Sequence, residues 1–74
     1  MEYEEKELRK KIAKNISELI RTRSKNGADV AEKIGVNRTV VYSWKNGVAV
    51  PNGLAIIKLC KEFGCEYEDI LGEL

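Results

Sequence analysis

The sequence NGADVAEKIGVNRTVVYSWKNG, residues 26–47, predicts two short helices joined by a tight turn. The first helix begins after Asn26, whose side chain can accept a hydrogen bond from a backbone N–H one turn into the helix. It ends at Gly35, because helices commonly stop at a residue with positive φ and glycine takes that conformation without a Cβ clash. Asn37 can cap the second helix, which we expect over about residues 38–46.

Apolar residues at helical spacing give each helix a buried side. Val30, Ala31 and Ile34 share one side of the first helix, and Val41 and Trp44 share one side of the second. We therefore expect the Trp44 ring to fill core and not to stack on bases. A second helix that begins two residues after the first ends is a helix-turn-helix, whose second member enters the major groove of DNA. The alternative is an ordinary pair of helices in a small bundle.

The outer side of the second helix carries the candidate base-reading groups. Arginine, threonine and serine side chains pair with base edges in the major groove. Tyrosine at the same surface could contact a thymine methyl group or a phosphate, or it could meet another subunit. The predicted base contacts are Arg38, Thr39, Tyr42 and Ser43. In the alternative interpretation these side chains are only solvated surface.

The segment VAEKIGVNRTVVYSWKNG, residues 30–47, resembles the phage repressor and Cro family of helix-turn-helix domains, also called the xenobiotic-response-element (XRE) family. Pro51 stands where that family has a proline, and AIIKLCKEFGCEYEDIL, residues 55–71, is similar to its two closing helices. The resemblance covers residues 12–71. It implies an all-α, five-helix, lambda-repressor-like domain that binds double-stranded DNA and regulates transcription as a repressor. It also implies a homodimer formed through the last two helices, with Leu54, Ile57 and Tyr67 as interface candidates.

Two kinds of group could hold the DNA backbone. Helix N-termini offer free N–H groups to phosphate, and lysine or asparagine side chains near the second helix can donate to it. The predicted phosphate contacts are Lys25, Asn26, Gly27, Asn37, Lys45 and Asn46. The basic segment RTRSK, residues 21–25, is also expected to approach phosphate.

Three features depart from the family that the chain resembles. Gly27 stands where the family usually has a glutamine that contacts phosphate and braces the second helix, and Lys45 stands where it often has glutamate. The loop after the second helix carries Val48 and Val50 where basic or polar residues are usual. The valines are expected either to fold one side chain into the core or to meet a partner.

The rest of the chain reads as support for these two helices. Residues 1–74 are expected to form one domain, with residues 1–11 a charged extension of a first helix over 3–23 and residues 52–71 two supporting helices. The apolar stripe of the first helix is Leu8, Ile12, Ile16, Leu19 and Ile20. The first supporting helix, capped by Asn52 and ended by Gly64, buries Ile56, Leu59, Cys60 and Phe63. The last helix, about residues 67–71, buries Ile70 and Leu71.

Composition narrows the function classes. The chain is 43% hydrophobic and 34% charged, which is typical of a globular domain. Its net charge is only +1, but residues 12–45 hold seven bases against three acids, and residues 46–74 hold two against five. The positive charge therefore gathers on the segment that contains the helix pair, as a phosphate-facing surface requires. No apolar run reaches the roughly 20 residues of a membrane span, and no signal-like segment opens the sequence, so a cytoplasmic location is expected.

The sequence offers little for catalysis or metal binding. It contains no histidine, and its two cysteines, Cys60 and Cys65, are too few for a four-ligand zinc site. We expect both thiols to be small core residues without a disulfide, no metal or other cofactor, and no enzymatic activity. The alternative function is that of an antitoxin or protein-interaction module, in which the helix-turn-helix is a scaffold and the valines and long first helix hold a protein partner.

Overall fold

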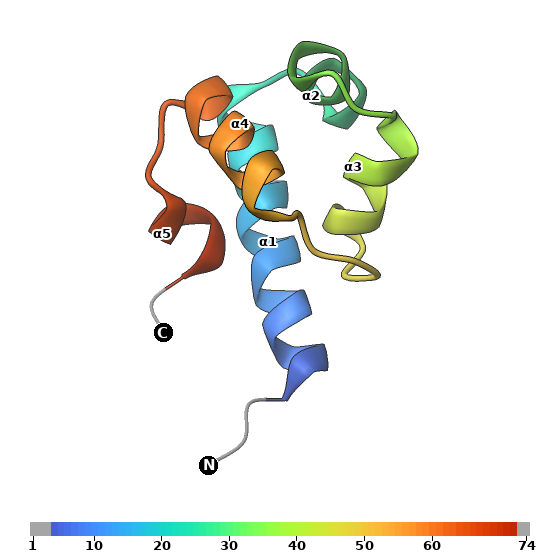
Figure 1. Ribbon diagram of the computed structural model, residues 1–74, viewed down its shortest axis with the longest axis vertical. Helices are drawn as coiled ribbons and strands as arrows, with labels where there is room; N and C mark the ends of the chain where they lie inside the picture. The colour runs from blue at the N-terminus through green and yellow to red at the C-terminus, as the bar shows by residue number, and fades with distance from the viewer. Residues whose placement is uncertain (1–3, 73–74) are drawn as a thin grey trace.

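The computed structural model describes residues 4–72, which form five α-helices and no strand. In chain order the helices are α1 (Glu5–Arg23), α2 (Gly27–Ile34), α3 (Arg38–Lys45), α4 (Gly53–Phe63) and α5 (Tyr67–Leu71). Figure 1 shows α1 as the central helix, with α5 on one side of it, α3 on the other, and α4 crossing its upper part. The predicted all-α, five-helix class is confirmed.

The long first helix begins slightly later than expected. It starts at Glu5, and the predicted start at Tyr3 lies outside the described residues. Glu5 and Glu7 occupy its first turn and Arg21 and Arg23 its last, an order of charge that the helix dipole favours at both ends. Its first turns extend past the other helices (Figure 1). This projecting part is the described portion of the predicted charged extension.

Asparagine side chains begin three of the helices, as the sequence predicts. The Oδ1 atoms of Asn26, Asn37 and Asn52 accept backbone N–H bonds of 2.8, 2.9 and 2.9 Å from the first turns of α2, α3 and α4. Gly35 and Gly64 end α2 and α4 with φ values of 76° and 66°. A side chain with a Cβ would be strained at both positions, so the two glycines confine each helix to its short span.

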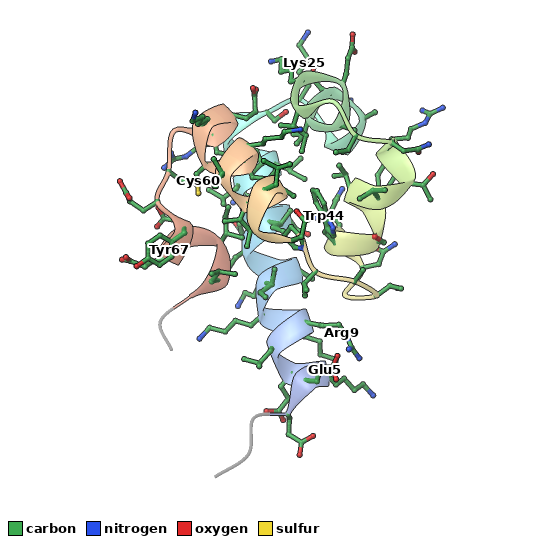
Figure 2. All side chains as sticks on the ribbon, in the orientation of Figure 1. Glu5, Arg9, Lys25, Trp44, Cys60 and Tyr67 are labelled. Carbon is green, nitrogen blue, oxygen red and sulfur yellow. The ribbon has the colours of Figure 1, made fainter. Side chains whose placement is uncertain are left out.

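The core forms where all five helices meet. It contains Ile16, Leu19, Ile20, Val30, Ala31, Ile34, Val41, Trp44, Ala55, Leu59, Phe63 and Ile70. Trp44 is 4% exposed, which confirms that its ring fills core; Figure 2 shows it between α3 and α1. Ile56 and Cys60, predicted to be buried on α4, are only half-buried, and Ala55 is buried in their place. The reason is that α4 turns toward α1 and α2 the side that holds Ala55, Leu59 and Phe63.

Half-buried apolar groups and one long-range hydrogen bond complete the packing. Leu8 and Ile12 are half-buried because α1 extends beyond the helices that would cover them. At the other end of the chain, Glu66 and Asp69 form a capping box that starts α5. The Asn15 amide donates a 3.0 Å hydrogen bond from α1 to the Ile70 carbonyl oxygen, which ties the last helix to the first.

Candidate nucleic-acid interface

Helix α3 has one side buried in the core and one side open to solvent. Val41 and Trp44 face the core, where α3 packs against α1 and α2. Arg38 and Thr39 are exposed on its outer side, and Tyr42 is 38% exposed there. Arg38 and Thr39 are therefore uncovered and Tyr42 is partly so, as entry into a groove requires.

Ser43 differs from the other three candidates because its hydroxyl is already used. It is half-buried, and its Oγ donates a 2.6 Å hydrogen bond to the Val40 carbonyl oxygen in the preceding turn. In this rotamer its lone pairs remain free to accept, while its proton is committed to the helix.

Tyr42 has a packing role that the sequence interpretation missed. The start of α2 lies against it, because Gly27 is buried and a Cβ added there would lie 3.3 Å from Tyr42 Cε1. The same Cβ would lie 3.4 Å from Val41 Cγ1 and 3.5 Å from Lys45 Cδ, and Lys45 Nζ lies 5.3 Å from the centre of the Tyr42 ring. Gly27 has little exposed surface of its own, and its predicted phosphate contact stays untested. A glycine at the first position of a helix that faces a tyrosine on the next helix is the only sequence signal for this packing.

The basic residues before α2 divide into those with partners and those without. Arg21 donates a 2.6 Å hydrogen bond to the Glu18 carboxylate, and this guanidinium lowers the pKa of Glu18. Arg23 donates to the carbonyl oxygens of Phe63 and Gly64 at 3.0 and 3.2 Å. Both arginines therefore have partners within the chain, and the phosphate contact of segment 21–25 stays a prediction.

Two exposed cations remain beside the helix pair. Lys25 projects from the turn between α1 and α2 (Figure 2), and Arg38 begins α3. Neither takes part in an ion pair anywhere within residues 4–72. An exposed cation without a protein partner can approach phosphate or base edges at little cost in lost contacts.

Three asparagines near the helix ends keep donors available. Asn26 and Asn37 use only Oδ1 for capping, so their amide Nδ2 groups can still donate. Both side chains are exposed, and so is Asn46 at the end of α3. These three amides have the exposure that their predicted phosphate contacts need.

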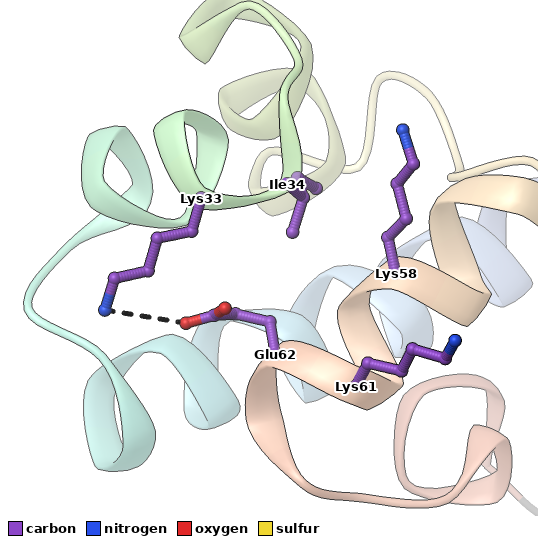
Figure 3. Close-up of a pocket in the computed structure, with 5 residues that line it drawn as sticks. All are labelled: Lys33, Ile34, Lys58, Lys61 and Glu62. Atoms are coloured by element: carbon purple, nitrogen blue, oxygen red, sulfur yellow. Dashed lines mark ion pairs between the residues drawn. The ribbon is translucent and has the colours of Figure 1, made fainter.

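A second charged surface lies between α2 and α4. Lys33, Ile34, Lys58, Lys61 and Glu62 line this hollow, which Figure 3 shows. Lys33 Nζ lies 3.3 Å from Asp29 Oδ2 and 3.6 Å from Glu62 Oε2, and Asp29, followed by Glu62, raises the pKa of Lys33. The lysine therefore links α2 to α4 and is not free to bind an anion.

An apolar groove runs between α4 and α5. Its lining includes Ile57, Cys60, Cys65 and Tyr67. Ile57 and Tyr67 are 56% and 57% exposed, and Leu54, one turn before Ile57, is 63% exposed. These are the three residues predicted for a dimer interface; all three are exposed, and Ile57 and Tyr67 line the same groove.

Both valines of the loop after α3 stay outside the core. Val48 and Val50 are both exposed. Cys60 and Cys65 are free thiols, each half-buried. No three histidine, cysteine, aspartate or glutamate side chains gather as metal ligands among residues 4–72. In the same part of the chain, no helix combines the length and apolarity needed to cross a membrane.

Residues 15–72 match a family model described as a Cro/C1-type HTH DNA-binding domain. The matched segment runs from the middle of α1 through the end of α5, and so includes the helix pair and its supporting helices. No curated protein and no solved structure matches the chain. The family match agrees with the resemblance seen in the sequence.

Proposed function

The chain belongs to the Cro/C1-type helix-turn-helix family of DNA-binding domains, and we propose that it binds a specific double-stranded DNA site and represses transcription by occupying it. The single observation that carries this proposal is the two-sided burial of α3. Val41 and Trp44 anchor one side in the core, while Arg38 and Thr39 stand uncovered on the other. A helix held in this way can present side chains to a major groove without unfolding.

The proposed base contacts begin at Arg38. Its guanidinium would donate to O6 and N7 of a guanine, the commonest specific contact of arginine in the major groove. Thr39 and Tyr42 would meet neighbouring base pairs. Ser43, whose proton is committed to Val40, would serve only as an acceptor in its present rotamer.

The proposed phosphate contacts surround this surface. Lys25 and Lys45 supply charge, and the amides of Asn26, Asn37 and Asn46 supply neutral donors. Contacts of this kind fix the register of the protein on DNA and carry no sequence information themselves.

We further propose that the domain acts as a homodimer through α4 and α5. Leu54, Ile57 and Tyr67 would form the apolar centre of the interface. The charges around the groove have opposite signs on its two sides, with Lys61 on α4 and Glu66 at the start of α5. A two-fold axis would bring the lysine of one copy to the glutamate of the other, which makes the face self-complementary.

The first test selects bound duplexes from a random pool and then titrates two variants against the selected site and a scrambled one. Arg38→Ala should weaken binding to the selected site by about 1–3 kcal/mol and relax preference at one base position. Lys25→Ala should weaken binding to both duplexes and reduce the salt slope by about 0.9, the value for one phosphate contact. A pool from which nothing is enriched would contradict the proposal.

The second test measures the dimer. Sedimentation equilibrium of Ile57→Lys should show a monomer at concentrations where the unmodified chain is dimeric, because the charge would enter an apolar interface. Lys14→Ala, an exposed change on α1, serves as the control. If Ile57→Lys associates as tightly as the control, α4 and α5 do not form the interface.

One observation favours a second candidate function, a protein-interaction module. Val48 is 73% exposed in the loop after α3, a position where an apolar side chain gains nothing in the monomer. Salt dependence separates the two functions, since duplex binding through several phosphates falls steeply with added salt and an apolar protein interface does not.

A further inference from the structure

We propose that Gly27, which is buried against Tyr42, determines DNA specificity by fixing the position of the Tyr42 ring at the edge of the DNA-facing surface. The inference rests on the proposed DNA-binding function and adds a positioning residue to it. Its basis is the contact between the first residue of α2 and the outer side of α3.

The Tyr42 ring can pack against the start of α2 because Gly27 has no side chain. A Cβ at this position would lie 3.3 Å from Tyr42 Cε1, closer than ordinary van der Waals contact, and close to Val41 and Lys45 as well. The ring occupies the space that a larger residue would fill. Tyr42 therefore packs against backbone on one side and keeps 38% of its surface open on the other.

Lys45, one turn further along α3, lies beside both Gly27 and the Tyr42 ring. Its aliphatic stem lies beside Gly27, and its ammonium group lies 5.3 Å from the centre of the Tyr42 ring. A cation at this distance over a tyrosine face is attracted to the ring. The ring is thus held between the backbone of α2 and a side chain of its own helix, which fixes where its hydroxyl points.

Gly27 is not needed for backbone conformation. Its φ does not fall in the positive region that favours glycine, and alanine is the better helix former at an ordinary helical position. The backbone conformation at this position therefore does not require glycine. The cost of a methyl group at residue 27 falls instead on the partly exposed Tyr42 ring, which can move outward.

The chain contains a matched control. Gly53 is the first residue of α4 and follows Asn52, just as Gly27 is the first residue of α2 and follows Asn26. Nothing lies within 4 Å of a Cβ placed at Gly53. Gly53→Ala therefore makes the same chemical change at the same helical position with no ring to displace.

The experiment compares Gly27→Ala, Gly53→Ala, Tyr42→Ala and the double variant Gly27→Ala/Tyr42→Ala by duplex selection, affinity titration and thermal melting. We expect both glycine variants to melt at or above the temperature of the unmodified chain. Gly27→Ala alone of the two should lose about tenfold in affinity for the selected site, within the range for one base contact, and should change base preference at one position. In the Tyr42→Ala background, Gly27→Ala should have no further effect on either property.

Three outcomes would overturn the inference. They are an unchanged base preference in Gly27→Ala, the same loss with and without Tyr42, and a large drop in the melting temperature of Gly27→Ala alone, which would make the glycine a core spacer. Failure of the unmodified chain to select any duplex would instead contradict the proposed function. The two failures are therefore distinguishable.

Discussion

At the scale of single residues, the two cysteines show how the end of a helix changes the chemistry of a side chain. Cys60 lies in the last turn of α4, and Cys65 follows the helix and donates its backbone N–H to the Cys60 carbonyl oxygen at 3.0 Å. Burial, and then the neighbouring Cys60 thiol, raise the pKa of Cys65 to about 11. Because the thiolate is the reactive form, Cys65 should be a poor nucleophile near neutral pH.

We expect iodoacetamide to alkylate Cys65 slowly at pH 7.5 and about ten times faster for each pH unit up to about pH 10, since the thiolate fraction rises by that factor below the pKa. Peptide-resolved mass spectrometry of timed samples would give the rate. The same chain in denaturant, where an ordinary thiol has a pKa of about 8.5, is the control. Equal rates for Cys65 in the native and denatured chain at pH 7.5 would contradict the raised pKa.

At the scale of helices, Arg23 joins the end of α1 to the end of α4. Its guanidinium donates to the carbonyl oxygens of Phe63 and Gly64, which stand where α4 ends and have no helical N–H partner of their own. The positive charge also lies at the negative end of the α4 dipole. One side chain thus satisfies two acceptors and fixes the angle between two helices.

Arg23→Ala should lower the free energy of unfolding by about 1–2 kcal/mol, as expected when a charged donor is removed from one partly buried and one exposed carbonyl oxygen. Urea titration followed by circular dichroism measures this loss. Arg21→Ala is the matched control, because its partner Glu18 is exposed and a surface pair of this kind contributes little to stability. Equal losses in the two variants would show that Arg23 does not cap α4.

The same contact marks the boundary of what the sequence can predict. The starts of α2, α3 and α4 follow from Asn26, Asn37 and Asn52, because a cap acts on a backbone N–H two or three residues away. The Arg23 contact crosses 40 residues and depends on how α1 and α4 meet. No local pattern encodes it, and RTRSK therefore read as a free basic segment.

The candidate site also has one part that the sequence predicts and one part that it does not. The open side of α3 follows from the spacing of Val41 and Trp44, so the exposure of Arg38 and Thr39 could be predicted. The packing of Tyr42 on Gly27 depends on the approach of α2 to α3, which periodicity within either helix does not determine.

At the scale of the whole molecule, one small core holds the recognition surface in place. A chain of 74 residues buries a modest fraction of its surface, and domains of this size are stable by only about 5 kcal/mol. Helix α3 is anchored by Val41 and Trp44, which enter the core that it shares with the other helices. A substitution in α4 that weakens packing in this core must therefore also reduce the fraction of molecules that present α3 to DNA.

Leu59→Ala and Leu54→Ala test this dependence with one chemical change at two sites on the same helix. Leu59 is fully buried, so its truncation should cost about 2–5 kcal/mol, remove much of the stability of the fold, and weaken DNA binding at temperatures where part of the chain is unfolded. Leu54 is 63% exposed, and its truncation should leave the melting temperature of dilute protein nearly unchanged. Melting over a range of concentrations separates the proposed dimer from the fold, because loss of an interface residue removes only the part of stability that grows with concentration. If Leu59→Ala stayed folded and bound DNA normally, α3 would not depend on the shared core, and the link between packing in α4 and function at α3 would be wrong.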